Sequence, residues 1–391
     1  MKIGFHYHIP AISKGDGIYM PGHLGRFIDS LADYCDQVIC FLHTPFPDEI
    51  IHMDYRILSG NVRLVDIGPH TNVIELTLKV NKYITIMRRH TSDLDLLLVR
   101  GPSPLLPAMV AASPVPTALL LVGDYVAGVN ELPQPRWRKE AIRLWSYWNK
   151  WGQNRAASHS LTFVNSRVLF DELKGKVPFL HEIRTTTLTR DDFFIRQDTC
   201  QARPYRLLYV GRMDRSKGLL QMVEAVSLLT ERGEDVILDL VGWPERGDPI
   251  LNEITALANR KNISEKIHYL GSRSLGPDLF ECYQHADIFL TVSLASEGFP
   301  RTIWEAMAHS LPVVATRVGS IPAFVEEAAE LVEPRRPLEL TEAISRLIHD
   351  GERRRHLIRV GQKLAQENTV ENRACDMASI IRNYLSHGSN T

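Results

Sequence analysis

Two carboxylates stand eight positions apart in the segment SEGFPRTIWEAMAHSLPVVAT, which covers residues 296–316. Glu297 precedes a Gly-Phe-Pro corner, and Glu305 falls about one turn into a helix predicted over residues 301–309. Carboxylates accept hydrogen bonds and can hold the vicinal hydroxyls of a sugar through both oxygens. A helix N-terminus between them would favour a phosphate. The pair therefore predicts a site for two sugar rings joined through phosphate, while the alternative for either glutamate is a solvated loop or helix position.

A second cluster of charge lies in YRLLYVGRMDRSKG, residues 205–218. An apolar strand runs into Gly211, Arg212 and Lys217 follow, and a helical pattern begins near Gly218. Ligands of open α/β sheets bind at the carboxyl ends of the strands, and a helix N-terminus with cations favours a phosphate or diphosphate. The alternative is a set of solvated loop charges. The segment contains neither a Walker A sequence nor GxGxxG, which argues against a P-loop NTPase.

Apolar runs of strand length alternate with helical patterns along the chain. The runs are mostly unbroken, as expected for parallel strands that are buried on both faces. Strands that alternate with helices predict doubly wound α/β sheets, and about ten strands suit two sheets better than one. The runs lie at residues 2–7, 37–41, 94–99, 117–122 and 161–164, and again at residues 206–210, 236–241, 266–270, 286–292 and 312–315.

Composition sets the broad class. The chain has 391 residues with a formal net charge of -1, which predicts two domains and gives no reason to expect nucleic acid as a partner. Its five cysteines contain no CxxC pair, so neither a disulfide framework nor a zinc site is expected. A formal DxD at Asp93-Leu94-Asp95 precedes an apolar run and indicates a strand-entry turn. No apolar run approaches the roughly 18–20 residues of a membrane span, so we expect a cytoplasmic protein, with contact at the inner face of a membrane left open.

The second half of the chain resembles a known family. EGFPRTIWEAMAHSLPVVAT is similar to the E-x7-E motif of retaining glycosyltransferases of the GT-B fold, family 4 type, and GRMDRSKG (211–218) is similar to the diphosphate loop of that family. VGWPERGD, IHYLGSR and ADIFLTVS lie between them in the family's order. The resemblance covers about residues 204–370 and is only architectural in the first half. It implies an α/β chain of two Rossmann-like, doubly wound domains that face each other across a cleft.

The resemblance also implies roles for particular residues. Glu297 would contact hydroxyls of the transferred sugar, and Glu305 would contact the ribose. Arg212 and Lys217 would hold the diphosphate as it leaves, which suits a reaction without a metal. The base would lie against residues 269–273. The other residues implied in donor binding are Gly211, Gly242, Tyr269, Arg273, Gly298, Phe299 and Pro300.

Some positions depart from the family pattern. Ser310 and Ser320 stand where the family usually has glycine. The histidine that the family usually places at the end of a first-domain strand is absent from TALLLVGDY, where Asp124 stands. A departing diphosphate would repel Asp124, but this carboxylate could bind the acceptor hydroxyl or accept its proton. The alternative for Asp124 is a helix N-cap or a turn.

The first half offers further candidates for the acceptor side. Arg100 ends the strand LLLVR and is a candidate for the cleft. Gly15 and Gly17, in SKGDGIYMPGHLGRF (13–27), resemble the glycine loop of the family, although glycines there could serve only the turn. His6 and His8 are interpreted as packed strand or strand-end histidines rather than ligands.

We expect the domain boundary in the polar stretch DDFFIRQDTCQARP, residues 191–204. A first Rossmann-like domain (1–195) would bind the acceptor, and a second (196–370) would bind the nucleotide sugar. Residues 371–391 would form a C-terminal helix that could cross back to the first domain, followed by a frayed tail.

The segment RWRKEAIRLWSYWNKWGQNR, residues 136–155, holds four of the six tryptophans of the chain. Its apolar side chains fall at helical spacing along one stripe, with basic residues around them. This pattern suits an amphipathic helix on an anionic membrane surface, in which case the acceptor would be lipid-linked. The alternative is a helix that packs on the core of the first domain. The membrane candidates are Trp137, Trp145, Trp148 and Trp151.

The sequence thus predicts an enzyme that transfers a hexose-type sugar from a UDP- or GDP-type donor to the hydroxyl of a glycan or lipid-linked acceptor. Retention, the absence of a metal or other cofactor, and a place in cell-surface polysaccharide or lipopolysaccharide synthesis rest on the resemblance. Two alternatives stay open. One is a nucleotide-sugar epimerase on the same fold. The other is a non-catalytic sugar-nucleotide-binding or scaffold protein, which the missing histidine favours and the two glutamates and two cations oppose.

Overall fold

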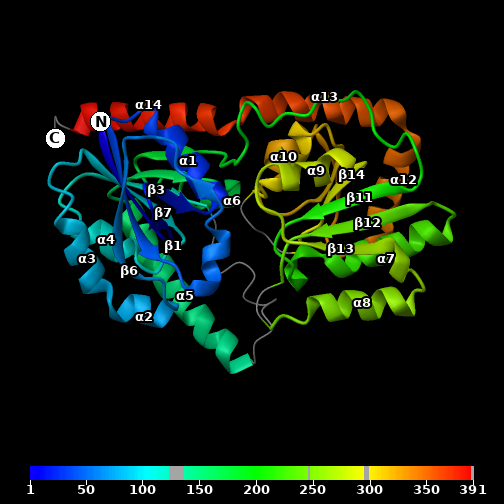
Figure 1. Cartoon of the computed structure of the whole chain (residues 1–391), viewed down its shortest axis with the longest axis horizontal. Coiled ribbons are helices and arrows are strands. Elements are labelled where there is room, and N and C mark those ends of the chain that lie inside the picture. Colours follow the sequence, from blue (N-terminus) through cyan, green and yellow to red (C-terminus); the bar gives the residue numbers. More distant parts are fainter. Residues whose placement is uncertain (123–135, 245–246, 295–298, 389–391) are drawn as a thin grey trace. The chain divides into compact units, whose positions relative to one another are not determined.

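The computed structural model describes residues 1–122, 136–244, 247–294 and 299–388. The chain divides into two compact units, and each is built on its own parallel sheet (Figure 1). Unit 1 comprises Met1–Val126, Glu140–Thr187 and Thr369–Thr391, and unit 2 comprises Ala127–Lys139 and Leu188–Asn368. The predicted fold class, two doubly wound α/β sheets, is confirmed.

In the described residues, the main sheet of unit 1 has seven strands in the order β10-β9-β8-β7-β1-β4-β6, and every pair is parallel. A small antiparallel sheet, β2-β3-β5, is formed by strands that fall between strands of the main sheet in the sequence. The strands of the main sheet are β1 (Lys2–Pro10), β4 (Gln37–Thr44), β6 (Val62–Pro69), β7 (Leu96–Gly101), β8 (Thr117–Leu121), β9 (Leu161–Val164) and β10 (Leu180–Glu182). Those of the small sheet are β2 (Ile12–Lys14), β3 (Gly17–Met20) and β5 (Tyr55–Arg56).

Helices cover both faces of this sheet, which explains why its central strands are apolar without alternation. Leu96 and Leu98 pack in one core with residues of α1 and α14. Leu97 and Val99 pack in the other core with residues of α3 and α4. The helices of this unit are α1 (Gly22–Ala32), α2 (Val73–Leu78), α3 (Val80–Arg88), α4 (Leu106–Ala112), α5 (Arg136–Ala157), α6 (Arg167–Leu173) and α14 (Val370–Gly388), with a 3-10 helix η1 (Pro47–His52). The first four residues of α5, Arg136–Lys139, are grouped with unit 2.

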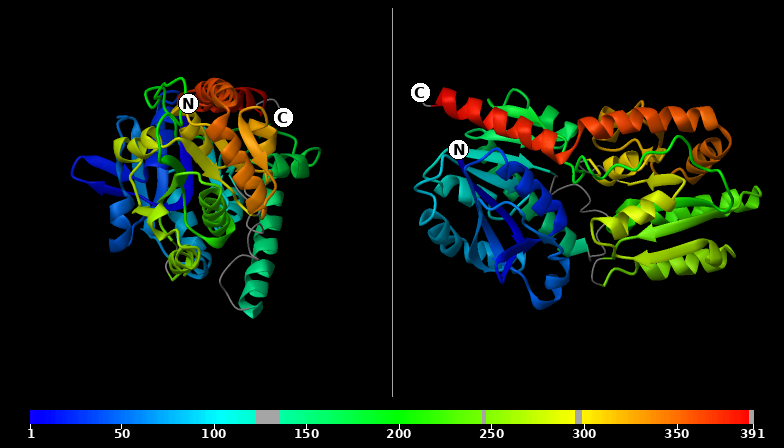
Figure 2. Two further views of the ribbon diagram at one scale, coloured as in Figure 1. Left: turned by 90° about the vertical axis from the view of Figure 1, so that its right-hand side faces the viewer. Right: turned by 45° about the horizontal axis from the view of Figure 1, so that its top comes forward.

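The last helix, α14, belongs to unit 1 although it follows the whole of unit 2 in the sequence. It packs against α1, and the right-hand view of Figure 2 shows α14 in red running along unit 1. Met377 and Ile381 are fully buried in the same core as Ile28 and Leu31 of α1. An Nη atom of Arg382 donates to the carbonyl oxygen of Tyr34 at 2.6 Å.

In the described residues, unit 2 has a sheet of six parallel strands in the order β13-β12-β11-β14-β15-β16. The strands are β11 (Tyr205–Val210), β12 (Val236–Val241), β13 (Ile267–Gly271), β14 (Ile288–Thr291), β15 (Val313–Thr316) and β16 (Ala329–Val332). The helices are η3 (Arg215–Lys217), α7 (Leu219–Glu231), α8 (Ile250–Arg260), η4 (Ser264–Lys266), α9 (Pro277–His285), α10 (Thr302–Ala308), α11 (Ile321–Val325), α12 (Pro337–His349) and α13 (Gly351–Glu367).

Each sheet has one topological switch point. In unit 1 the chain builds outward from β1 through β4 and β6, and then starts again on the other side of β1 with β7. In unit 2 it builds outward from β11 through β12 and β13, and starts again with β14. In open α/β sheets the ligand crevice lies at the carboxyl ends of the strands at this point. A ligand crevice is therefore expected at the ends of β1 and β7 in unit 1 and at the ends of β11 and β14 in unit 2.

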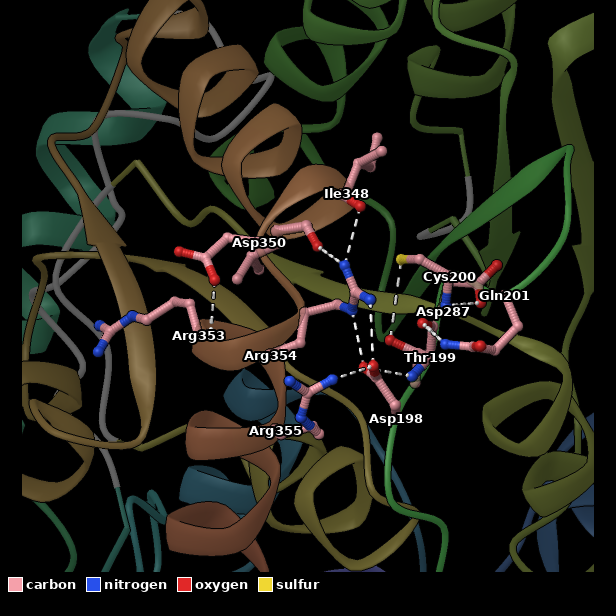
Figure 3. A network of polar contacts seen from close by, with 11 residues as sticks. Asp198, Thr199, Cys200, Gln201, Asp287, Ile348, Asp350, Arg353, Arg354 and Arg355 are labelled. Atoms are coloured by element: carbon pink, nitrogen blue, oxygen red, sulfur yellow. Dashed lines mark hydrogen bonds and ion pairs between the residues drawn. The ribbon is translucent and has the colours of Figure 1, made fainter.

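A network of ion pairs and hydrogen bonds anchors the segment that leads into β11 (Figure 3). Nε of Arg354 donates to Oδ1 of Asp198 at 2.8 Å, and an Nη atom donates to Oδ2 at 3.2 Å. The same guanidinium donates to two carbonyl oxygens at the end of α12. Asp287 accepts from the backbone N–H groups of Cys200 and Arg206 at 2.7 and 2.9 Å. These contacts fix the start of β11, and thereby the position of the loop that leaves its other end.

Candidate active site

The segment 211–218, called the phosphate turn from here on, leaves β11 at the switch point of unit 2. It contains η3 and ends at Gly218, which has a φ of 70° and begins α7. A Cβ atom at Gly218 would lie 2.2 Å from the carbonyl oxygen of Val292. The N–H of Leu294 donates to the carbonyl oxygen of Ser216 at 2.7 Å. The phosphate turn thus lies backbone to backbone on the segment that follows β14 and leads toward Glu297.

A second close approach joins the phosphate turn to the end of β12. A Cβ atom at Gly242 would lie 1.8 Å from the carbonyl oxygen of Gly211, and Gly242 has a φ of 142°. Gly211 N–H donates to the carbonyl oxygen of Val241 at 3.0 Å, and Gly242 N–H donates to that of Gly271 at 2.9 Å. The Gly211 backbone therefore leaves no room for a side chain at position 242, and a Cβ atom at Gly211 would lie 2.9 Å from the Tyr209 hydroxyl oxygen.

The two arginine side chains of the phosphate turn have different hydrogen-bond partners. Nε of Arg212 donates to Oδ2 of Asp214 at 2.9 Å, and this guanidinium is half exposed. Nε of Arg215 donates to Glu253 of α8 at 3.0 Å, so Arg215 is directed to a neighbouring helix. Oδ1 of Asp214 accepts from the N–H of Ser216 at 2.8 Å and caps η3. Lys217 is half-buried at the end of η3. Arg212 and Lys217 both lie between β11 and α7, and their binding of a diphosphate stays a prediction.

Glu305 lies in the first turn of α10 and is 5% exposed, so it is not a solvated helix residue. Its Oε2 atom accepts a hydrogen bond of 2.7 Å from the Tyr283 hydroxyl. Tyr283 is fully buried, and burial together with the Glu305 charge raises the pKa of its phenol well above the usual range. The phenol therefore stays a donor, which fixes the direction of the Glu305 carboxylate. The sequence analysis missed Tyr283, which lies on α9 with no motif around it.

The corner between the two glutamates is described only in part. Glu297 and Gly298 lie outside the described residues. The side chain of Phe299 is 4% exposed and stacks on Trp304, with ring centroids 4.5 Å apart. Pro300 is half-buried. Phe299 therefore holds the corner against the core through its side chain.

The residues expected against the base lie at the end of β13. The Tyr269 side chain is 47% exposed, and its hydroxyl donates to the carbonyl oxygen of Gly242 at 3.2 Å. Arg273 is exposed just beyond the strand. An exposed aromatic ring that is tied to the Gly242 backbone gives a flat surface beside the phosphate turn.

The glycine loop expected in the first domain forms the β2–β3 hairpin. Gly15 has a φ of 62° at the tip of the hairpin, where it is exposed and no atom lies within 4 Å of a Cβ position. Gly17 is buried, and a Cβ there would lie 2.9 Å from the Tyr19 ring. Asp124, the candidate proton acceptor, lies outside the described residues.

Arg100 lies at the end of β7, at the switch point of unit 1. It is 7% exposed, and its guanidinium carbon is 5.0 Å from the centroid of the Tyr7 ring.

His6 is fully buried, as expected of a packed strand histidine, and its Nδ1 is 2.9 Å from the carbonyl oxygen of Phe41. Burial lowers the pKa of His6 and of His8 to about 3 each and that of His43 to about 4. The sequence analysis did not single out His43, which ends the run QVICFLH.

The tryptophan-rich segment forms α5, whose polarity is inverted relative to an ordinary surface helix. Among its described buried positions are Ser146, Asn149 and Gln153. Its large apolar side chains are exposed: Trp137 73%, Leu144 74%, Tyr147 56%, Trp148 61% and Trp151 63%. Trp145, expected in the same stripe, is half-buried. A groove of about 610 Å³ runs along this helix and is lined by α4 residues such as Pro107 and Ala111 and by Trp148 and Trp151.

Within the described residues, no helix is long and apolar enough to cross a membrane. No group of three or more His, Cys, Asp or Glu side chains in the described part of the chain is arranged to hold a metal ion. Asp95 of the formal DxD accepts from the N–H of Lys2 at 2.7 Å, where β1 begins, so it serves as the predicted strand-entry turn.

Comparisons with known proteins agree with this architecture. Residues 191–364 match the family model "Glycosyl transferases group 1". The "Putative teichuronic acid biosynthesis glycosyltransferase TuaC" of Bacillus subtilis is 25% identical over 307 residues, which are 76% of this chain and 70% of that protein. "Spore coat protein SA" of the same organism is 26% identical over 166 residues, 41% of this chain and 44% of the relative. The crystal structure of Anabaena HepE in complex with UDP and glucose superposes with a TM-score of 0.74 at 18% identity, covering 98% of this chain and 100% of HepE.

These findings define a chain with the GT-B fold of glycosyltransferases. Its second half is a glycosyl transferases group 1 domain, as the resemblance of the two motifs predicted. The first curated relatives are matched over 37–44% of their own length. Their whole-protein activities are therefore a basis for proposals rather than properties of this chain.

Proposed function

We propose that the chain is a retaining hexosyltransferase of the family 4 type that needs no metal. It moves a hexose from a UDP- or GDP-type sugar to the hydroxyl of a glycan or lipid-linked acceptor, in the synthesis of a cell-surface polysaccharide or lipopolysaccharide. The observation that carries this proposal is the close approach of backbones at the switch point of unit 2. There a Cβ atom at Gly218 would meet the carbonyl oxygen of Val292, and one at Gly242 would meet that of Gly211, beside the cations of the phosphate turn.

The proposed reaction follows from this arrangement. The bond between the sugar C1 and the diphosphate oxygen breaks, and the acceptor oxygen forms its bond to C1 on the same face. Arg212 and Lys217, with the N-terminus of α7, stabilise the charge that develops on the diphosphate. Glu305, held by Tyr283, accepts hydrogen bonds from the ribose, and Glu297 orients the sugar. Asp124 takes the proton of the acceptor hydroxyl.

One comparison favours a UDP-type donor, and the structure adds a surface on which a base of either type could stack. The HepE structures contain UDP, UDP-glucose, or UDP and glucose, and they share the fold over nearly the whole chain. The exposed ring of Tyr269 offers a stacking surface at the place expected for the base. The pathway assignment is supported by the similarity to TuaC, a putative teichuronic acid biosynthesis glycosyltransferase, and by the similarity in fold to WaaG, a glycosyltransferase involved in lipopolysaccharide biosynthesis.

The first test is nucleotide binding by calorimetry and thermal shift with UDP, GDP, ADP and their sugar conjugates. We expect one nucleotide series to bind, and Arg212→Ala to weaken it about 10–100-fold, as for the loss of a charge-assisted hydrogen bond. Arg215→Ala is the matched control, because this cation of the same turn is directed to Glu253. Unchanged binding in Arg212→Ala would remove the phosphate turn from the donor site.

Contact with an anionic membrane surface is part of the proposal. The side of α5 turned to solvent carries Trp137, Leu144, Trp148 and Trp151, whereas the side turned inward is small or polar. The core-packing alternative predicts the opposite arrangement. Arg136, Arg138 and Arg155 are exposed on the same helix, and cations around a tryptophan face suit anionic lipid. A peripheral helix of this kind would bring the enzyme to a lipid-linked acceptor.

Vesicle flotation tests this contact. We expect binding to vesicles of phosphatidylglycerol and much weaker binding to phosphatidylcholine. The double variant Trp148→Ala/Trp151→Ala should lose about tenfold in partitioning or more, from the loss of apolar area. Trp145→Ala, on the half-buried side of α5, is the control. Equal flotation of the double variant and the parent protein would refute a membrane role for this helix.

The runner-up is a non-catalytic sugar-nucleotide-binding or scaffold protein. The similarity to spore coat protein SA of Bacillus subtilis favours this alternative. A nucleotide-sugar epimerase would convert the donor with no acceptor present. Incubation with the binding nucleotide sugar separates the three: release of UDP only with acceptor supports the transferase, conversion of the sugar alone supports the epimerase, and binding with no turnover supports the scaffold.

A further inference from the structure

Arg100 combines burial and charge at the switch point of unit 1. Its strand, β7, pairs with β1 so that His6 lies opposite Val99, and Tyr7 and His8 therefore run alongside Arg100. Arg100 is 7% exposed. The site lies at the carboxyl ends of the two strands between which the direction of sheet building reverses, where open α/β sheets bind ligands.

The charge of Arg100 has no counter-charge in the part of the chain that the structure describes. There its Nε atom is buried without a hydrogen-bond partner, and its guanidinium lies over the face of the Tyr7 ring. Burial lowers the pKa of Arg100, but a guanidinium remains protonated at neutral pH. A buried, unpaired charge is among the most costly groups a fold can contain. Such a group is retained for a purpose that an apolar residue of the same length could not serve.

The histidine that interacts with Arg100 carries no negative charge. His8 is kept neutral by burial, and Arg100 also lowers its pKa. His6, which pairs with Val99, and His43, which contacts Tyr83, lie on the other face of the sheet. Among the described residues, Nδ1 of His8 is buried and has no hydrogen-bond partner. Arg196, by contrast, is a cation of low exposure in unit 2 that donates to the carbonyl oxygens of Gln284 and Ala286. The surroundings of Arg100 thus supply hydrogen-bonding atoms and leave the charge to be neutralised from outside.

We infer that Arg100, with His8 beside it, binds an anionic oxygen group of the acceptor. The ligand class is a sugar or polyol that carries a phosphate monoester or a carboxylate, because the planar fork of a guanidinium pairs with both through two hydrogen bonds. Neutral sugars would leave the buried charge unpaired and would be rejected for that reason. This inference rests on the proposed function in one respect, since it assigns the bound molecule as acceptor.

The experiment measures melting temperature and calorimetric binding with glucose, glucose 6-phosphate and glucuronate at matched ionic strength. Saturating UDP is present throughout, so that the phosphate turn is occupied. We expect at least one of the two anionic sugars to bind and glucose not to bind, and the two anionic probes separate phosphate from carboxylate. Arg100→Met should weaken this binding about tenfold or more, and Arg100→Lys should weaken it less. Arg63→Met is the control, because Arg63 is an exposed residue near the opposite end of β6 in the same sheet.

Stability without ligand separates a binding role from a structural one. If Arg100 is an unpaired charge kept for a ligand, Arg100→Met should melt at the same temperature as the parent protein or higher. A clear loss of stability in Arg100→Met would show a structural partner and would overturn the inference, as would unchanged anion binding in this variant. Failure of both anionic sugars to bind the parent protein would overturn it as well. Nucleotide binding is measured separately: if neither UDP nor GDP binds, the proposed function is refuted and the anion site is left standing.

Discussion

The strands around the two switch points follow each other in the same order, but backbone forms one edge and side chains form the other. In unit 2 the edge is made of backbone: glycines at the ends of β11 and β12 bring main chains into contact, and its cations lie in a short turn of local sequence. In unit 1 the edge is made of side chains: Arg100 and three histidines come from strands that are far apart in the sequence and are largely buried. A site made of backbone suits a part of the ligand that is the same in every donor, such as a diphosphate. Side-chain construction suits a part that differs between relatives, such as an acceptor.

The largest effect should come from filling the backbone contact. Gly242→Ala places a Cβ atom 1.8 Å from the Gly211 carbonyl oxygen, at a φ that disfavours any side chain. Strain and overpacking together should cost about 2–6 kcal/mol of stability or force the phosphate turn to move, and nucleotide binding should be lost. Calorimetry with UDP and thermal unfolding measure both effects.

Gly233→Ala is the control for this substitution. Gly233 also has a positive φ, of 85°, but no atom lies within 4 Å of its Cβ position. It should lose about 1 kcal/mol and keep nucleotide binding. If the two variants behave alike, positive φ rather than the contact between backbones explains the glycine at position 242, and the contrast between the two edges weakens.

This difference in construction also decides what the sequence could predict. Gly211, Arg212 and Lys217 lie within a few positions of each other, so their neighbourhood could be read from spacing. The central strands were predicted because both of their faces are buried, whereas β6, at the sheet edge, has a mixed pattern of burial and was missed. The contact of Tyr283 with Glu305 joins two helices, and no spacing encodes it. In α5 the helical periodicity predicted the tryptophan stripe, but only packing decides which side of the helix faces inward. The buried side is the one that carries Ser146, Asn149 and Gln153.

A second prediction concerns acid. His6, His8 and His43 are neutral in folded unit 1, with pKa values lowered to about 3, 3 and 4 by burial. An unfolded histidine takes up a proton below about pH 6.5. Unfolding therefore binds protons in this range, so stability is complete above about pH 6.5 and falls as the pH decreases toward 4. The slope is at most about 1.4 kcal/mol per pH unit for each histidine.

Hydrogen exchange at pH 7 and pH 5, corrected for intrinsic rates, compares the two units. Burial also lowers the pKa of His181 in unit 1 and of His309 in unit 2, so unit 2 should lose stability as well, but less. His43→Phe, which keeps an aromatic ring against Tyr83, should reduce the pH dependence of unit 1 alone. Equal acid sensitivity of the two units would mean that the buried histidines are not the cause.

The smallest expected effect tests whether unit 2 also depends on one side-chain contact. Tyr283→Phe removes the hydrogen bond to Oε2 of Glu305 and leaves a buried carboxylate short of a donor. The loss should be about 1–3 kcal/mol of stability. If the hydroxyl orients Glu305 toward the ribose, the affinity for UDP should fall as well. The two residues should then be coupled in a double-mutant cycle, with Glu305→Gln and Tyr283→Phe together costing less affinity than the sum of the single changes. A stability loss with additive effects on affinity would leave Tyr283 as a core residue, and the edge of unit 2 would then depend on backbone and cations alone.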